Sequence, residues 1–246
     1  MGAMLKIYDL EVVDRCLYWK SEKTLIVGDL HLGYEDTLTE SGYALPRTQQ
    51  KENYEIFERI FNKLDKKIER IILLGDVKHF FGKILRQELI DFEELVKFFE
   101  KKIGKRVKII VTKGNHDKIL EPLIIKYTNI ELKDYFLEKG VLFLHGDAES
   151  MKKAYFEIQD KRTKLIVLGH FHPALVLQDK KGVKVEKYKC FLYGFSPEYK
   201  REVVFVPSFF PLIEGSDIKQ ELEIYNKSMK VIAVTDEGEL YKFEKL

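Results

Sequence analysis

All six histidines of this 246-residue chain lie in five short motifs that also contain glycine, aspartate or asparagine. The motifs are GDLHLG (28–33), GDVKH (75–79), GNHD (114–117), HGD (145–147) and GHFHP (169–173). Carboxylate, imidazole and amide groups together suit divalent ions such as Mn²⁺, Fe²⁺ or Zn²⁺. We therefore expect a metal site, and its candidate ligands are Asp29, His31, Asp76, Asn115, His145, His170 and His172.

The spacing inside two motifs supports a shared site. Asp29 and His31 are two residues apart, as are His170 and His172. In extended backbone such pairs point to the same side. The motif glycines remove a Cβ where the chain must turn sharply, which lets the backbone approach the metals.

Each motif follows a short apolar run that indicates a buried strand. The runs cover residues 24–27, 71–74, 109–111, 141–144 and 165–168. Because α/β proteins place ligands in the crevice at the carboxyl ends of their strands, the five motifs should converge there. Between the runs, apolar residues at helical spacing predict helices over 46–68, 85–103, 119–127 and 149–159.

The two ends of the chain are rich in strand patterns. These patterns cover 4–19 and 183–243, with turns at Lys181-Gly182 and Glu237-Gly238. Strands at both ends predict a second sheet packed on the first. The expected fold is an α/β/β/α sandwich of two mixed sheets flanked by helices, formed by a single domain over 4–246. Residues 1–3 are interpreted as a remnant of cloning before a native Met4.

Composition limits the partners. The 42 basic and 40 acidic residues give a formal net charge of +2, so the chain lacks the basic excess common among nucleic-acid-binding proteins. Cys16 and Cys190 form no CxxC motif, which fits a reducing cytoplasm. We expect neither a membrane span nor a signal peptide. The lysine-rich stretches 97–108 and 180–189 are expected to be solvated, and Phe98, Phe99, Phe209 and Phe210 to be core residues.

The five motifs, in this order, resemble the signature of calcineurin-like metallophosphoesterases: D-x-H, G-D, G-N-H-[DE], H and G-H-x-H. The resemblance covers 25–173 and implies two metal ions. It assigns Asp29, His31 and His172 to one ion, and Asn115, His145 and His170 to the other, with Asp76 as the bridge. It also implies that His116 is the catalytic acid near the leaving group, with Asp117 holding its ring.

In such a site, two cations about 3.5–4 Å apart activate a bridging hydroxide that attacks phosphorus in line. We expect Mn²⁺, with Fe²⁺, Zn²⁺ or Ni²⁺ as alternatives. Protein phosphatases of the superfamily carry G-D-x-x-D-R-G, whereas Lys78-His79-Phe80 stands here, which favours phosphodiester substrates.

A closer resemblance links the chain to archaeal phosphoesterases related to DNA double-strand-break repair nucleases and to bacterial ligase-associated phosphoesterases. It rests on GDLHLG, on GDVKH and on the stretches 41–46 and 205–209. It implies that His79, with Asn115 and His116, contacts the substrate.

The expected function is thus nuclease-like phosphodiester hydrolysis, on single-stranded DNA or DNA ends. The alternatives are a small-molecule or cyclic-nucleotide phosphodiesterase, a phosphomonoesterase and a non-catalytic scaffold. The sequence does not indicate an oligomeric state.

Overall fold

The computed structural model describes residues 5–43, 47–65, 67–179, 183–222, 225–226 and 228–244. Three sequence-based expectations lie outside these residues. They are the cloning remnant, the Lys181-Gly182 turn and the end of the 41–46 stretch. Among the described residues, no helix has the length and apolar character needed to cross a bilayer.

Among the described residues, the first sheet has seven strands, in sequence order. Strands β1 to β4 are antiparallel neighbours, and β4 to β7 are parallel neighbours. A 3₁₀ turn over Lys20–Glu22 connects β3 to β4. The strands are β1 Lys6–Ile7, β2 Leu10–Val13, β3 Cys16–Trp19, β4 Thr24–Val27, β5 Arg70–Leu73, β6 Lys108–Thr112 and β7 Ile130–Lys133.

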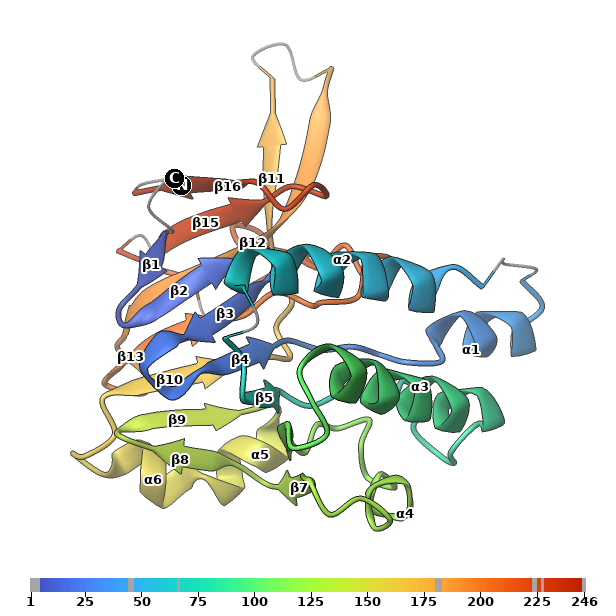
Figure 1. Cartoon of the computed structure of the whole chain (residues 1–246). Helices are drawn as coiled ribbons and strands as arrows, with labels where there is room; N and C mark the ends of the chain where they lie inside the picture. Colours follow the sequence, from blue (N-terminus) through green and yellow to red (C-terminus); the bar gives the residue numbers. More distant parts are fainter. Residues whose placement is uncertain are drawn as a thin grey trace.

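The second sheet has the order β14-β11-β12-β13-β10-β9-β8, with β15 paired to β12 and β16 paired to β15. Strands β9, β10 and β13 are parallel, and the β11–β12 hairpin projects from the body of the molecule (Figure 1). The strands are β8 Phe136–Glu138, β9 Val141–Leu144, β10 Leu165–Leu168, β11 Pro173–Gln178, β12 Val185–Ser196, β13 Arg201–Phe205, β14 Ser216–Asp217, β15 Lys230–Val234 and β16 Leu240–Phe243.

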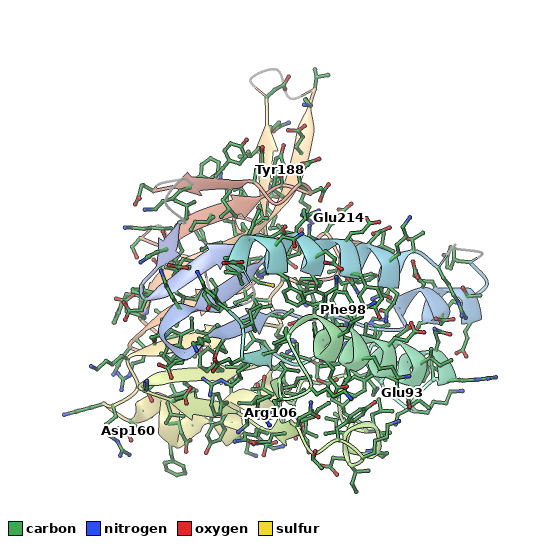
Figure 2. All side chains as sticks on the ribbon, in the orientation of Figure 1. Glu93, Phe98, Arg106, Asp160, Tyr188 and Glu214 are labelled. Atoms are coloured by element: carbon green, nitrogen blue, oxygen red, sulfur yellow. The ribbon has the colours of Figure 1, made fainter. Side chains whose placement is uncertain are left out.

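Helices cover the outer faces of the two sheets. Phe57 and Phe92 of α2 and α3 pack on one face of the first sheet, and Ile158 of α6 packs on the second. In Figure 2, Phe98 lies between α2 and α3, where its ring stacks on Tyr54 at 4.5 Å between centroids. The helices are α1 Tyr34–Glu40, α2 Gln49–Leu64, α3 Arg86–Lys102, α4 Glu121–Ile124, α5 Ala148–Lys153 and α6 Tyr155–Gln159.

The alternation along β4 shows why the layers stack in this order. Leu25 and Val27 face the helices, whereas Ile26 faces the second sheet, and all three are fully buried. A strand that is buried on both faces needs a continuous apolar run, which is the pattern that the sequence carries. The predicted α/β/β/α sandwich of two mixed sheets is confirmed.

Other expectations need correction. The N-terminal strands extend the first sheet and do not join the second, because short turns connect β2 to β3 and β3 to β4, and strands joined by so short a connection pair with each other. The helix expected over 149–159 is interrupted at Ala154, and the one over 119–127 shortens to α4. Helix α1 has no counterpart in the sequence analysis.

Candidate metal centre

The five motifs begin at the carboxyl ends of parallel strands, as expected, but the strands belong to two sheets. Motifs 28–33, 75–79 and 114–117 follow β4, β5 and β6 of the first sheet. Motifs 145–147 and 169–173 follow β9 and β10 of the second. The packing of the two sheets therefore brings the motif side chains together.

Asp29, His31 and His172 form a first group, with ligand atoms within 4.8 Å of one another. The Nε2 atom of His172 contacts a carboxylate oxygen of Asp29. The buried Nε2 of His31 has no hydrogen-bond partner among the described residues. An imidazole nitrogen held without a partner beside carboxylates is the arrangement that a metal ligand needs.

Asp76, His145 and His170 form a second group. His145 Nδ1 donates to the carbonyl of Leu74 at 2.8 Å, so Nε2 is the ring nitrogen that faces the other candidate ligands. This Nε2 atom lies 3.3 Å from Asp76 Oδ2, 3.0 Å from Asn115 Oδ1 and 3.1 Å from His170 Nδ1. Asn115 therefore joins the second group.

Asp76 connects the two groups. Its Oδ2 atom faces His145 of the second group and also lies 3.8 Å from His31 Nε2 of the first. The backbone N–H of His116 donates to Oδ1 at 2.9 Å and fixes the carboxylate. One carboxylate thus stands within reach of both groups.

His79 and His116 lie beside the first group. His79 Nδ1 is 3.2 Å from His31 Nδ1, and the three rings of His31, His79 and His116 form a further set that could hold a metal ion. His116 Nδ1 donates to the carbonyl of His79, so Nε2 is the atom that faces Asp76 Oδ2, at 3.8 Å. Every histidine of the sequence is therefore part of one cluster.

The electrostatics of the cluster favour ionised carboxylates. Burial opposes the charge on Asp29, yet His172 and His145 hold the pKa of its carboxyl below the ordinary value. Burial similarly opposes the charge on Asp76, while His145 holds the pKa of that carboxyl below the ordinary value. The site therefore contains two buried carboxylates that require positive charge.

The pKa values of three imidazoles, those of His31, His79 and His145, shift in two directions. Burial lowers the pKa of His31 to about 3 and that of His79 to about 4, so both rings are neutral and able to donate a lone pair. Burial also acts on His145, but Asp29 and Asp76 outweigh it and raise its pKa to about 10. The carboxylates thus draw a positive charge to the place where a cation would lie.

The expected extended backbone at the paired ligands is wrong. His31, His170 and His172 have φ values of 45°, 63° and 43°, and Asp76 has 46°. The chain enters the left-handed region within four residues of the ends of β4, β5 and β10, a conformation that costs roughly 1–2 kcal/mol per non-glycine residue. Hydrogen bonds hold these turns: His31 N–H donates to Asp76 O at 2.9 Å, and His170 N–H to Asp29 Oδ2 at 3.0 Å.

Gly114 shows what the motif glycines permit. A Cβ at this position would come within 2.2 Å of Asp76 Oδ1. Such a contact is sterically impossible, so glycine is needed for the β6 loop to pass the central carboxylate. The loop after β6 therefore lies directly against Asp76, a candidate metal ligand.

The expectation that Asp117 holds the ring of His116 is wrong. The Asp117 carboxylate is fully buried and accepts from the backbone N–H groups of Val77 at 3.0 Å, Lys78 at 3.3 Å and Gly114 at 3.1 Å. Three N–H donors point at it because the β5 and β6 loops run side by side. Asp117 thus links these two loops. The carbonyl of His79, and not Asp117, accepts from the ring of His116.

Two positioning residues escaped the sequence analysis. The fully buried Glu88 of α3 accepts from the N–H groups of His79 at 3.0 Å, Phe80 at 2.7 Å and Leu85 at 2.8 Å. The available signal was an acidic residue in the first turn of a predicted helix.

Lys189, expected in a solvated stretch, is buried and donates to the carbonyls of Ser208, Phe210 and Ile213.

The segment that Lys189 holds reaches the candidate centre. Phe209 N–H and Ser208 Oγ donate to the carbonyl of Asp29 at 3.0 and 3.2 Å. Ser216 N–H donates to the carbonyl of His172 at 2.8 Å. Phe99, Phe209 and Phe210 are fully buried, so the expectation that they are core residues is confirmed.

Two stacked sheets with aspartate, histidine and asparagine at the ends of their parallel strands define an α/β protein with a candidate metal centre between the sheets. The chain belongs to the calcineurin-like phosphoesterase family, whose family model matches residues 22–205. This membership implies a hydrolase of phosphate esters.

The fold is similar to that in the crystal structure of Pseudomonas putida nuclease MPE, with a TM-score of 0.62 and 18% sequence identity over 95% of this chain and 94% of that one. No curated protein matches the sequence.

Proposed function

We propose that this protein is a phosphodiesterase that uses two divalent metal ions to cleave nucleic-acid strands. The observation that carries the proposal is the position of Asp76 Oδ2, 3.3 Å from His145 Nε2 and 3.8 Å from His31 Nε2. A single carboxylate between two sets of nitrogen and oxygen donors is suited to a pair of cations. Oxygen and imidazole donors suit Mn²⁺, the ion that we propose, with Fe²⁺, Zn²⁺ and Ni²⁺ as alternatives.

The residues divide between the ions as the two groups suggest. Asp29, His31 and His172 would hold one ion, and Asn115, His145 and His170 the other, with Asp76 shared. The bound ions would supply an activated water and neutralise charge on the phosphate oxygens.

His116 is suited to protonate the leaving oxygen. Its Nδ1 donates to the carbonyl of His79, so Nε2 is the ring nitrogen that faces the cluster and the one from which a protonated ring would give up its proton. A proton delivered there lets an alkoxide depart as an alcohol, an effect worth on the order of 10²–10⁴ in rate. Neighbouring His79 and Asn115 are assigned to contact the substrate.

Two observations favour a nucleic-acid strand as substrate. The solved structure with a similar fold is that of a nuclease. In addition, His79, which we assign to substrate contact, lies in the cluster beside His31. Single strands, flaps and ends suit the net charge of +2 better than intact duplex does, because duplex binding gains its affinity from several phosphate contacts. A flexible strand can bend one phosphate into the crevice.

A substrate panel tests the proposal. Protein loaded with Mn²⁺ is assayed on single-stranded and duplex oligonucleotides, a cyclic nucleotide, a bis-phenyl phosphodiester and a phenyl monoester. We expect cleavage of the single strand and the diester, with chelator abolishing both. If the protein cleaves a small nucleotide diester but leaves the oligonucleotides intact, the proposed nucleic-acid substrate is wrong. If it hydrolyses none of the esters, the proposed catalytic function is wrong.

A further inference from the structure

A half-exposed aromatic side chain lies against the proposed proton donor. Phe81 is 53% exposed, and the centroid of its ring is 3.6 Å from that of His116, with 33° between the two planes. His116 itself is 9% exposed. The Phe81 ring thus presents a flat apolar surface to solvent at the edge of the candidate centre.

Phe81 is held in place by the loop that carries it. The carboxylate of Glu88 accepts from the N–H groups of His79 and Phe80 before Phe81 and from that of Leu85 after it. Both ends of the short arch 81–84 are therefore fixed to the start of α3. The position of the ring above His116 follows from these bonds.

The surroundings of the arch suit a polyanion. Lys83 and Arg86 are exposed and line a hollow beside Phe81's loop. The hollow also contains Asp36 and Glu40, but Asp36 is paired with Arg47. Cations beside an aromatic platform are the combination with which proteins bind single-stranded nucleic acid.

We propose that Phe81 stacks on a base of the substrate. This base belongs to the leaving group, whose oxygen takes a proton from His116. The inference rests on the proposed function, since it needs a nucleotide substrate and His116 as the proton donor. Stacking would align the leaving nucleoside with His116 and would tolerate any base, because every base has a π-face. Phe81 is thus a residue that determines specificity for substrates whose leaving group carries a base.

The test uses dinucleotides, each with a single phosphodiester bond, and two analogues that lack one base or the other. The product that retains the phosphate identifies the leaving side. With Mn²⁺-loaded wild-type protein, kcat/KM should fall about 5- to 150-fold when the base on the leaving side is missing, the range expected for one stacked base. Removing the other base should change it little.

Variants separate stacking from simple shielding of His116. Phe81→Ala and Phe81→Leu should lose the preference for the intact dinucleotide, whereas Phe81→Trp should keep it. Phe156→Ala, which removes an 80%-exposed aromatic from α6, is the matched control and should behave as wild type.

Two outcomes overturn the inference, and they are distinguishable. If Phe81→Ala lowers kcat/KM equally on the intact and abasic substrates, or leaves it unchanged, the ring does not stack on a base. If wild-type protein cleaves the bis-phenyl diester but neither a dinucleotide nor a single-stranded oligonucleotide, both the inference and the proposed nucleic-acid function are wrong.

Discussion

At the residue scale, the ring of His116 is oriented by a carbonyl and points its Nε2 atom towards Asp76. We expect His116→Ala to slow cleavage of a diester with an alkoxide leaving group by about 10²–10⁴, and cleavage of a nitrophenyl diester far less, because nitrophenolate leaves without a proton. Metal content should not change. Steady-state kinetics on both esters, with the exposed Lys118→Ala as control, make the comparison. Equal losses on both would mean that His116 binds the phosphate instead.

Residue types and spacing were sufficient to predict which side chains meet. They could not predict what each one contacts. Asp117 adjoins His116 in sequence, but its carboxylate turns to the backbone of the β5 and β6 loops. Such a contact depends on the path of two loops that are distant in sequence, and no local pattern encodes it.

At the scale of elements, Glu88 joins the start of α3 to the loop of His79. Glu88→Gln keeps the shape of the side chain but replaces one acceptor oxygen by a donor, so at least one of three backbone N–H groups loses its partner. We expect a loss of about 1–3 kcal/mol in the free energy of unfolding. A lower kcat/KM with unchanged metal content should accompany it.

Denaturant unfolding and kinetics measure these two effects of Glu88→Gln. The matched control is Glu94→Gln, an exposed position of the same helix, which should change neither. A Glu88→Gln protein as stable and active as wild type would show that the loop does not depend on this carboxylate.

The buried Lys189 of β12 should make the stability of the fold depend on pH. Burial, with Arg15 nearby, lowers the pKa of its ammonium group well below the ordinary 10.5. Between the lowered value and 10.5, the folded protein binds fewer protons at this site than the unfolded chain does, so stability rises with pH in that window. Relative to Lys189→Met, the wild type should therefore gain stability as the pH is raised towards 10.

Thermal unfolding of both proteins at a series of pH values gives the difference in Tm. Lys187→Met, an exposed neighbour on β12, serves as the control and should show no such trend. A Tm difference between wild type and Lys189→Met that stays constant with pH would contradict the lowered pKa.

The apolar runs predicted the strands that carry the motifs to within one residue at each end, because a strand buried on both faces has a continuous apolar sequence. The assignment of strands to sheets was harder to predict. Strands β4 and β10 carry similar patterns, yet they lie in different sheets. The buried Lys189 was missed for a related reason: its three carbonyl partners come from a loop about twenty residues away in sequence.

At the scale of the whole molecule, we predict a preference for phosphodiesters over phosphomonoesters. Lys78, the lysine of the second motif, is buried and donates to the carbonyl of Phe80, so it does not clamp a dianionic phosphoryl group. Comparison of kcat/KM for a nitrophenyl diester and the matching monoester should favour the diester by at least about tenfold, or about 1.4 kcal/mol. A preference for the monoester would refute this interpretation.

The central claim is that two sheets assemble one centre for two metal ions around Asp76. Calorimetric titration of chelator-stripped protein with Mn²⁺, checked by elemental analysis, measures it most directly. We predict two ions per chain for the wild type, fewer than two for Asp76→Ala, and two for Asp147→Asn, which retains the cap of α5. A wild-type protein that binds one ion or none in excess Mn²⁺, or an Asp76→Ala protein that still binds two, would contradict the account.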